Sequence, residues 1–263
     1  MTVKLADFSA DFGKAAGDYR RHRAGFPPEL IVRLQKQYGL GLRDQRVLDL
    51  GTGTGTLARQ FAQAGCDATG LDISAAMVDQ ACQLDVEEGV AVEYYVGKAE
   101  ELPFPAGEFD VVIAGQCWHW FDRAKTAAAA RRVLKRKGAL VIAHFDWIPL
   151  DDNLVAATEA LIVKHNPDWK AAGGMGMHPQ WMADVTRAGF SSRETFSFDI
   201  DVPYTHEGWL GRIRASAGIG ASLSPEKVAA FNAEHTALLK ALFPVAELTA
   251  LHRVWALVAL TAA

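Results

Sequence analysis

The feature that most constrains the fold is a regular alternation of short apolar runs and helical stretches from residue 46 to residue 145. The apolar runs are nearly continuous, as in strands buried on both faces. Strand–helix–strand repetition of this kind predicts a parallel sheet covered by helices on both sides. The predicted strands are 46–50, 67–71, 90–96, 109–114 and 139–144, and the predicted helices are 56–64, 74–84 and 123–134.

The flanking segments do not continue this alternation. A helix is predicted at 30–38, because prolines precede it and Gly39 follows it. The interval 204–250 is helical in pattern and too long for an ordinary connection. The fold prediction is therefore α/β: a Rossmann-like, doubly wound sheet of seven mostly parallel strands, with a helical cap formed by insertions. Beyond 145 the predicted helices are 151–165 and 179–188, and the predicted strands are 192–200 and 253–259.

Composition excludes several classes of protein. The chain has 263 residues, is half apolar and carries a net charge of −4, so it lacks the excess of basic residues that is typical of nucleic-acid-binding proteins. No apolar stretch approaches the roughly 18 residues of a membrane span, and the first residues lack the apolar region of a signal peptide. The three cysteines are widely spaced, which argues against a zinc or iron–sulfur site. We expect a cytoplasmic protein with free thiols and no membrane partner.

A glycine-rich segment, Asp49-Leu-Gly51-Thr-Gly53-Thr-Gly55, joins the first predicted strand to the helix behind it. Glycines permit positive φ and a close approach of backbone to a ligand, and the helix N-terminus offers unpaired N–H groups. The third glycine comes one residue earlier than in the dinucleotide fingerprint, and the lysine of a P-loop is missing. A tight turn that binds nothing is the alternative at this point.

Two acids sharpen the hypothesis of a nucleoside-containing ligand. Asp72 ends the second predicted strand, 17 residues after Gly55. A carboxylate there can accept hydrogen bonds from both hydroxyls of a ribose. Asp49 stands just before the loop, where it would repel a pyrophosphate and suit a ligand that carries cationic groups.

These segments carry a family resemblance. Residues 47–55, Val-Leu-Asp-Leu-Gly-Thr-Gly-Thr-Gly, closely resemble motif I of the class I S-adenosylmethionine-dependent methyltransferases. Residues 97–104, Gly-Lys-Ala-Glu-Glu-Leu-Pro-Phe, resemble the segment beside the adenine in that family. Residues 109–120 resemble its fourth strand and catalytic-edge loop, and 132–140 resemble the helix end, glycine turn and fifth strand. The matching segments cover about 46–145 in the family's order.

The resemblance implies S-adenosylmethionine as cofactor, S-adenosylhomocysteine as product, no metal, and a small-molecule acceptor. We predict one domain over 1–263, with a cofactor-binding core at 46–145 and lead-in helices at 1–45, and the loss of the strand–helix alternation predicts cap segments at 145–178 and 204–250. The lead-in, Tyr19-Arg-Arg-His-Arg23-Ala-Gly-Phe-Pro-Pro-Glu-Leu30, is similar to that of trans-aconitate-type enzymes, where it closes over the cofactor.

The cofactor-binding residues follow from the resemblance position by position. Many relatives carry Asp where this chain has Lys98, so the adenine contact would pass to the Ala99 backbone or to Glu100. The implied residues are Tyr19, Arg23, Asp49, Gly51, Thr52, Gly53, Gly55, Asp72, Ile73, Met77, Ala99, Glu100, Gln116 and Trp118.

Methyl transfer is an in-line displacement, for which the protein mainly supplies alignment and a dry pocket. A base is required only when the acceptor must lose a proton; a carboxylate needs none. His119, in the edge loop after the fourth strand, is the first candidate for a base or an orienting group. His144 and Asp146, at the end of the fifth strand, are secondary catalytic candidates, and His178 is weaker.

The candidates for the acceptor site are Trp120, Trp209 and Arg212. Trp118 or Trp120 can offer a π face to the sulfonium or form a wall of the acceptor pocket, and we expect at least one of the two in the core. Trp209 and Arg212 lie in the 204–250 cap segment, where an arginine suits a carboxylate or another anion. A core tryptophan and a surface arginine are the alternatives there.

Other functions stay open. An RNA or protein methyltransferase is one, although residues 115–118, Gly-Gln-Cys-Trp, stand where base-methylating enzymes often carry Asn/Asp-Pro-Pro-Tyr/Phe. A nicotinamide oxidoreductase is disfavoured by the glycine spacing and by Asp49. The third alternative is a non-catalytic protein that binds the cofactor and regulates a partner.

Overall fold

The computed structural model describes residues 3–5, 8–10 and 25–262. Its contacts form two compact units. The sheet unit consists of Gly25–Phe145, His178–Ser197 and Val254 to the C-terminal end. The helical unit contains Asp146–Met177 and Phe198–Arg253, together with two short N-terminal strands, β1 (Val3–Leu5) and β2 (Phe8–Ala10), which pair antiparallel.

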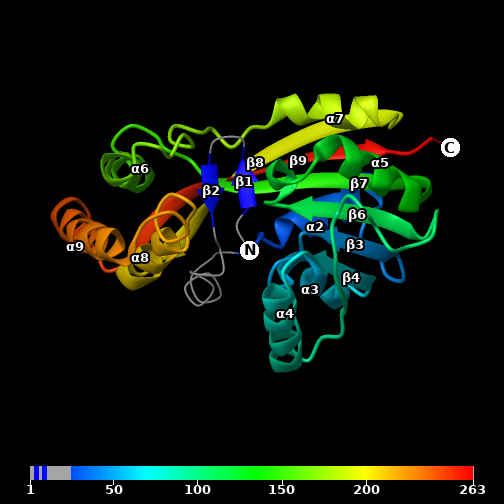
Figure 1. Cartoon of the computed structure of the whole chain (residues 1–263), viewed down its shortest axis with the longest axis horizontal. Coiled ribbons are helices and arrows are strands. Elements are labelled where there is room, and N and C mark those ends of the chain that lie inside the picture. The colour runs from blue at the N-terminus through cyan, green and yellow to red at the C-terminus, as the bar shows by residue number, and fades with distance from the viewer. Residues whose placement is uncertain (1–2, 6–7, 11–24, 263) are drawn as a thin grey trace. The chain divides into compact units, whose positions relative to one another are not determined.

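Seven strands form one sheet in the order β5-β4-β3-β6-β7-β9-β8 (Figure 1). The neighbours from β5 to β7 all pair in parallel. The chain runs outward from β3 through β4 to β5 and then returns to β6 on the other side of β3, so the order reverses beyond the carboxyl ends of β3 and β6. Ligands of open α/β sheets bind at such a point. The strands are β3 (Arg46–Leu50), β4 (Asp67–Asp72), β5 (Glu93–Val96), β6 (Phe109–Gly115), β7 (Leu134–Trp147), β8 (Ser192–Tyr204) and β9 (Leu248–Leu260).

Helices cover both faces of the sheet unit. In Figure 1, α5 and α7 lie above the strands, and α3 and α4 lie below them. The predicted α/β, Rossmann-like sheet is confirmed. The helices of this unit are α2 (Glu29–Tyr38), α3 (Thr56–Gln63), α4 (Ala75–Glu88), α5 (Arg123–Val133) and α7 (Met182–Arg187), which follows the 3₁₀ turn η3 (Pro179–Trp181).

Local chemistry sets the helix ends. The Ser74 hydroxyl accepts a hydrogen bond from the Met77 N–H and caps α4, as its sequence predicts. Gly89, with φ +66°, ends α4 four residues later than predicted, because glycine adopts the left-handed conformation that closes a helix. Buried residues from the strands and from α5 and α7 then form the main core, including Leu48, Leu50, Val112, Leu140, Trp118, Val185 and Leu257.

The helical unit has a core of its own. Its helices are α6 (Leu154–His165), α8 (His206–Arg214) and α9 (Pro225–Leu242). Buried aromatic and aliphatic side chains from all three pack together, among them Leu154, Ile162, Trp209, Ile213, Phe231 and Leu239. Among the described residues, no helix combines the length and apolar character needed to cross a bilayer.

Three strands are longer than predicted. β7 begins directly after α5 rather than at 139. Leu134 pairs with Phe109 and Ala139 with Val111, so the charged stretch Lys135–Lys137 falls in the register shift between these two pairs. The left-handed Lys137, with φ +60°, accommodates that irregularity. The 204–250 interval, predicted as helical throughout, begins and ends in strand residues, because Tyr204, Leu248 and Ala250 are buried in the core of the helical unit.

Candidate cofactor and acceptor site

The glycine-rich loop connects β3 to α3 with three left-handed residues. Gly51, Gly53 and Gly55 have φ values of +61°, +56° and +78°. A Cβ on Gly51 would approach Cys117 within 3.0 Å, whereas a Cβ on Gly53 would meet nothing within 4 Å. Gly53 is therefore required by its backbone conformation, and the space beside it is open.

Asp49 is buried under this loop, with 2% of its surface exposed. Its carboxylate accepts a hydrogen bond from the Thr52 hydroxyl at 2.7 Å. Burial raises the pKa of Asp49 to about 7, although this hydrogen bond favours the ionised form. Asp49 can thus change its charge near neutral pH when a cationic ligand approaches.

Asp72 connects the end of β4 to the loop. One carboxylate oxygen accepts the Gly53 N–H and the other accepts the Ser74 N–H, each at 2.8 Å. Burial raises the pKa of Asp72, and these backbone hydrogen bonds oppose the shift. Each oxygen of an ionised carboxylate has a further lone pair, so both can still accept a hydroxyl.

Four further predicted cofactor-binding residues lie on two segments, one after β4 and one after β5. Ile73 follows Asp72 and is 41% exposed, which is unusual for a large apolar side chain and suits a wall for a planar ring. Met77 is half-buried in the first turn of α4, and Ala99 is buried. The Glu100 carboxylate accepts the Asp122 N–H at 2.9 Å, so it is engaged at the start of α5.

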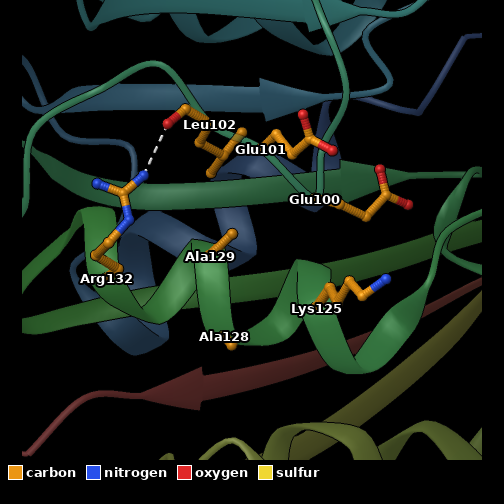
Figure 2. A pocket seen from close by; sticks show the side chains of 7 residues that line it. All are labelled: Glu100, Glu101, Leu102, Lys125, Ala128, Ala129 and Arg132. Carbon is orange, nitrogen blue, oxygen red and sulfur yellow. Dashed lines mark hydrogen bonds between the residues drawn. The ribbon is translucent and has the colours of Figure 1, made fainter.

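Glu100 also borders an open recess between α5 and the segment that follows β5 (Figure 2). Arg132 closes one end of this recess by donating to the Leu102 carbonyl at 2.8 Å. Among the described residues, Glu100 is the one predicted cofactor-binding residue that lines this recess, and no residue of the glycine-rich loop does. The lining residues are Glu100, Glu101, Leu102, Lys125, Ala128, Ala129 and Arg132.

The edge loop after β6 begins with a strained residue. Gln116 has φ +61°, its N–H donates to the Ala143 carbonyl at 2.9 Å, and its side-chain amide donates to the Phe145 carbonyl. A left-handed residue that is not glycine stores strain of the kind often seen at functional sites. The loop continues into the 3₁₀ turn η2 (Trp118–Trp120).

The two tryptophans of η2 have different environments. Trp118 is fully buried, and its indole N–H donates to Asp184 at 3.1 Å. Trp118 is thus buried, as the sequence leads us to expect for at least one of the two tryptophans, and its contact with a cofactor stays a prediction. Trp120 is half-buried beside His119, with ring centroids 4.6 Å apart.

Three histidines meet at the carboxyl ends of β6 and β7, and we call His119, His144 and His178 the histidine cluster. The ring centroids of His119 and His144 are 5.4 Å apart, and those of His144 and His178 are 4.3 Å apart. His178 stacks on Trp181 at 4.2 Å. His178 ranks below the other two from the sequence because it lies in a predicted cap segment, whereas the structure brings it against His144 near the end of β7.

The remaining candidates belong to the helical unit. Trp209 is fully buried and donates to the Thr158 hydroxyl at 3.0 Å, so it is a core residue there. The guanidinium carbon of Arg212 lies 4.7 Å from the centroid of the Trp147 ring. Asp146 is half-buried at the end of β7. Tyr19 and Arg23 lie outside the described residues.

One buried network beside the loop is missed by sequence analysis. It joins Arg59 on α3, Asp85 on α4 and Tyr94 on β5. No periodicity or motif marks these residues. The only signal in the sequence is glycine at positions 55 and 70, where a large neighbouring side chain needs room.

Comparison with known proteins finds a match to a known family over part of the chain. Residues 48–142 match the family model described as a methyltransferase domain. An uncharacterized methyltransferase of Mycobacterium tuberculosis is 36% identical over 154 residues, which cover 59% of this chain and 58% of that relative. The uncharacterized methyltransferase YcgJ of Bacillus subtilis is 30% identical over 175 residues, or 64% of this chain and 65% of YcgJ. The chain therefore spans less than two thirds of the length of these relatives.

Solved structures share the fold. The structure of YcgJ superposes with a TM-score of 0.57 and covers 90% of this chain and 98% of that chain. Phosphoethanolamine N-methyltransferase 2 of Haemonchus contortus, in complex with phosphomonomethylethanolamine and S-adenosylhomocysteine, also has a TM-score of 0.57. It is 21% identical and covers 94% of this chain and 57% of that chain.

Proposed function

We propose that the chain transfers a methyl group from S-adenosylmethionine to a small-molecule acceptor, because residues 48–142 match the model of a methyltransferase domain and resemble the class I S-adenosylmethionine-dependent enzymes. The observation that carries the proposal is the position of Asp72, whose carboxylate accepts the N–H groups of both Gly53 and Ser74. The residue that would bind the ribose thereby also holds the loop that would pass under the rest of the cofactor.

The residues fit the cofactor in charge and in space. The Asp72 oxygens retain acceptor capacity for two ribose hydroxyls, and the exposed Ile73 provides an apolar wall beside them. Asp49, ionised on binding, would favour a ligand with an ammonium and a sulfonium group. When bound, the cofactor supplies a methyl group that the positive sulfur already activates.

The chain's own residues then have to align the acceptor and keep water out. The histidine cluster is the group placed to do so at the ends of β6 and β7. A neutral imidazole can accept a proton from a hydroxyl or amine acceptor, or orient a carboxylate that has no proton to lose. No step in this scheme requires a metal.

We favour a carboxylate as the acceptor group. Within the helical unit, Arg212 lies against the face of Trp147, and a guanidinium presents two parallel N–H donors that match a carboxylate. An acidic small molecule also suits a chain without a basic surplus better than RNA does. We propose a small molecule as partner, rather than a nucleic acid or a membrane.

The test is transfer of label from methyl-labelled S-adenosylmethionine to a panel of carboxylates, phenols and amines, with total RNA and a protein extract as further acceptors. Label on a carboxylate, inhibited by S-adenosylhomocysteine, supports the proposal. Label on RNA or protein alone contradicts the small-molecule acceptor. With the acceptor identified, His119→Ala should lower turnover about 100-fold and leave cofactor affinity unchanged. His206→Ala, outside the histidine cluster, serves as the control.

A further inference from the structure

A buried polar network lies directly beside the glycine-rich loop. Arg59 and Asp85 are each only 5% exposed, and they form an ion pair with 2.9 Å between Nη1 and Oδ1. The Tyr94 hydroxyl donates to the same Asp85 oxygen at 3.2 Å. Burial and the charge of Asp85 raise the pKa of Tyr94, which keeps this hydroxyl protonated as a donor. Three elements of the sheet unit, α3, α4 and β5, therefore meet at one carboxylate.

The glycines of the motif make room for this network. Gly70 on β4 is the register partner of Tyr94 on β5, and a Cβ on Gly70 would lie 2.6 Å from the Tyr94 ring. A Cβ on Gly55 would overlap the Tyr94 hydroxyl and come within 2.9 Å of Arg59 Nη1. The tyrosine ring thus crosses β4 at a glycine and ends against the last glycine of the loop.

Such a network fixes the relative positions of its residues more than it stabilises the folded state. Removing two charges from water is costly, so a buried ion pair is weak evidence for stabilisation, and its best-attested role is to specify one arrangement. Here the arrangement specified is the loop backbone at Gly55, the residue from which α3 begins. A ligand binds more tightly to a loop held in its bound conformation, because less ordering has to occur on binding.

We propose that Arg59, Asp85 and Tyr94 are positioning residues that hold the glycine-rich loop in the conformation that binds the cofactor. The inference rests on the proposed function for the identity of that cofactor. It assigns a role to Gly70 and Gly55 beyond contact with the ligand: both are glycine so that Tyr94 can reach the loop.

The first test is Tyr94→Phe, which removes only the hydroxyl. The affinity for S-adenosylhomocysteine, measured by calorimetry well below the unfolding temperature, should fall about tenfold, since the lost hydrogen bond is to a charged group. Tyr95→Phe is the matched control: the neighbouring tyrosine donates to Glu93 in an exposed hydrogen bond of 2.7 Å. The control should change affinity less than twofold. Equal affinities for the two variants would overturn the proposal.

Two further readouts separate positioning from general stability. Arg59→Lys retains a cation for Asp85 and should recover most of the affinity that Arg59→Met loses; equal losses would contradict the role of the ion pair. In the Asp85→Asn background, Tyr94→Phe should lower the affinity for S-adenosylhomocysteine less than it does in the wild-type chain, because both changes act on one hydrogen bond. Additive losses would count against a shared network.

Hydrogen exchange in the ligand-free protein gives a readout that does not depend on the proposed function. In the ligand-free protein, hydrogen exchange at the amides of residues 52–57 should accelerate about tenfold in Tyr94→Phe and stay unchanged in Tyr95→Phe. Unchanged exchange in both variants overturns the positioning role. Failure of the wild-type protein to bind S-adenosylhomocysteine, with accelerated exchange in Tyr94→Phe, would instead refute the proposed cofactor and leave the positioning role standing.

Discussion

At the ends of β3 and β4, glycines with left-handed backbone and a carboxylate with spare acceptor capacity border open space. In the helical unit, by contrast, polar groups bond to one another among buried rings. The Glu159 carboxylate accepts both the Trp147 indole N–H and the Gly173 N–H, at 2.7 and 2.8 Å. The first region offers open space at Gly53, whereas the second is filled by its own core. We therefore expect substitutions in the first region to change ligand affinity and substitutions in the second to change stability.

The largest effect is expected in the helical unit. Trp209→Ala removes a fully buried ring and leaves the Thr158 hydroxyl without its donor. We expect a loss of about 3–5 kcal/mol in the free energy of unfolding, measured with urea, and no change in the cofactor affinity of the folded protein. Leu242→Ala, at a position that is 60% exposed on α9, should cost less than about 0.5 kcal/mol. Similar costs for the two variants would contradict the assignment of Trp209 to the core.

The next effect is expected at the ribose position. Asp72→Ala removes the acceptor of two backbone N–H groups and of two proposed ribose hydroxyls, so cofactor affinity should fall about 100-fold, or ~2.7 kcal/mol. Asp67→Ala, at the exposed start of the same strand, is the matched control and should bind as the wild type does. Calorimetric titration of both variants is the measurement, and unchanged affinity in Asp72→Ala would refute its role.

A smaller effect separates the loop glycine from an ordinary helix-capping glycine. Gly53 and Gly89 are both left-handed, and neither would meet an atom within 4 Å of an added Cβ. Alanine at either position should therefore cost about 1–2 kcal/mol of stability through backbone strain alone. Only Gly53→Ala should also weaken cofactor binding, by about tenfold, because its amide is bound to Asp72. Equal cofactor affinity in the two variants would mean that the loop backbone does not contact the ligand.

The smallest effect is a pH dependence from Asp49. Its pKa is raised to about 7 in the folded protein from an ordinary value of 3.8, so the folded state binds more protons between these values. This contribution to stability is therefore full below pH 3.8 and is lost as the pH rises through 7. Affinity for the cationic cofactor should show the opposite trend, rising about fivefold between pH 6 and 8. This increase in affinity should be missing in Asp49→Asn. An increase that persists in that variant would mean that another group titrates.

The same contrast explains how much of the molecule its sequence predicts. The strands β3, β4 and β6 and the glycine-rich loop are predicted to within one residue, because continuous apolar runs and left-handed glycines are local constraints. The start of β7 is not predicted, because Lys135–Lys137 has the polarity of a turn and lies in the register shift between the Phe109–Leu134 and Val111–Ala139 pairs.

Residues whose surroundings depend on distant parts of the chain are the ones that the sequence misses or leaves ambiguous. Tyr94 acts through Asp85 and reaches Gly55, which lies 39 positions earlier in the chain. His178 meets His144 only because the chain returns to the end of β7 after a long excursion. Trp118 and Trp120 are two residues apart and alike in sequence, and only the structure shows that Trp118 is fully buried while Trp120 is half-buried.

The most direct test of the central claim is a calorimetric titration of the wild-type protein with S-adenosylmethionine, S-adenosylhomocysteine and NADH. The account predicts saturable binding of the first two at a single site and no heat of binding for NADH, whose pyrophosphate Asp49 would repel. Binding of NADH, with no response to either S-adenosyl compound, would contradict it.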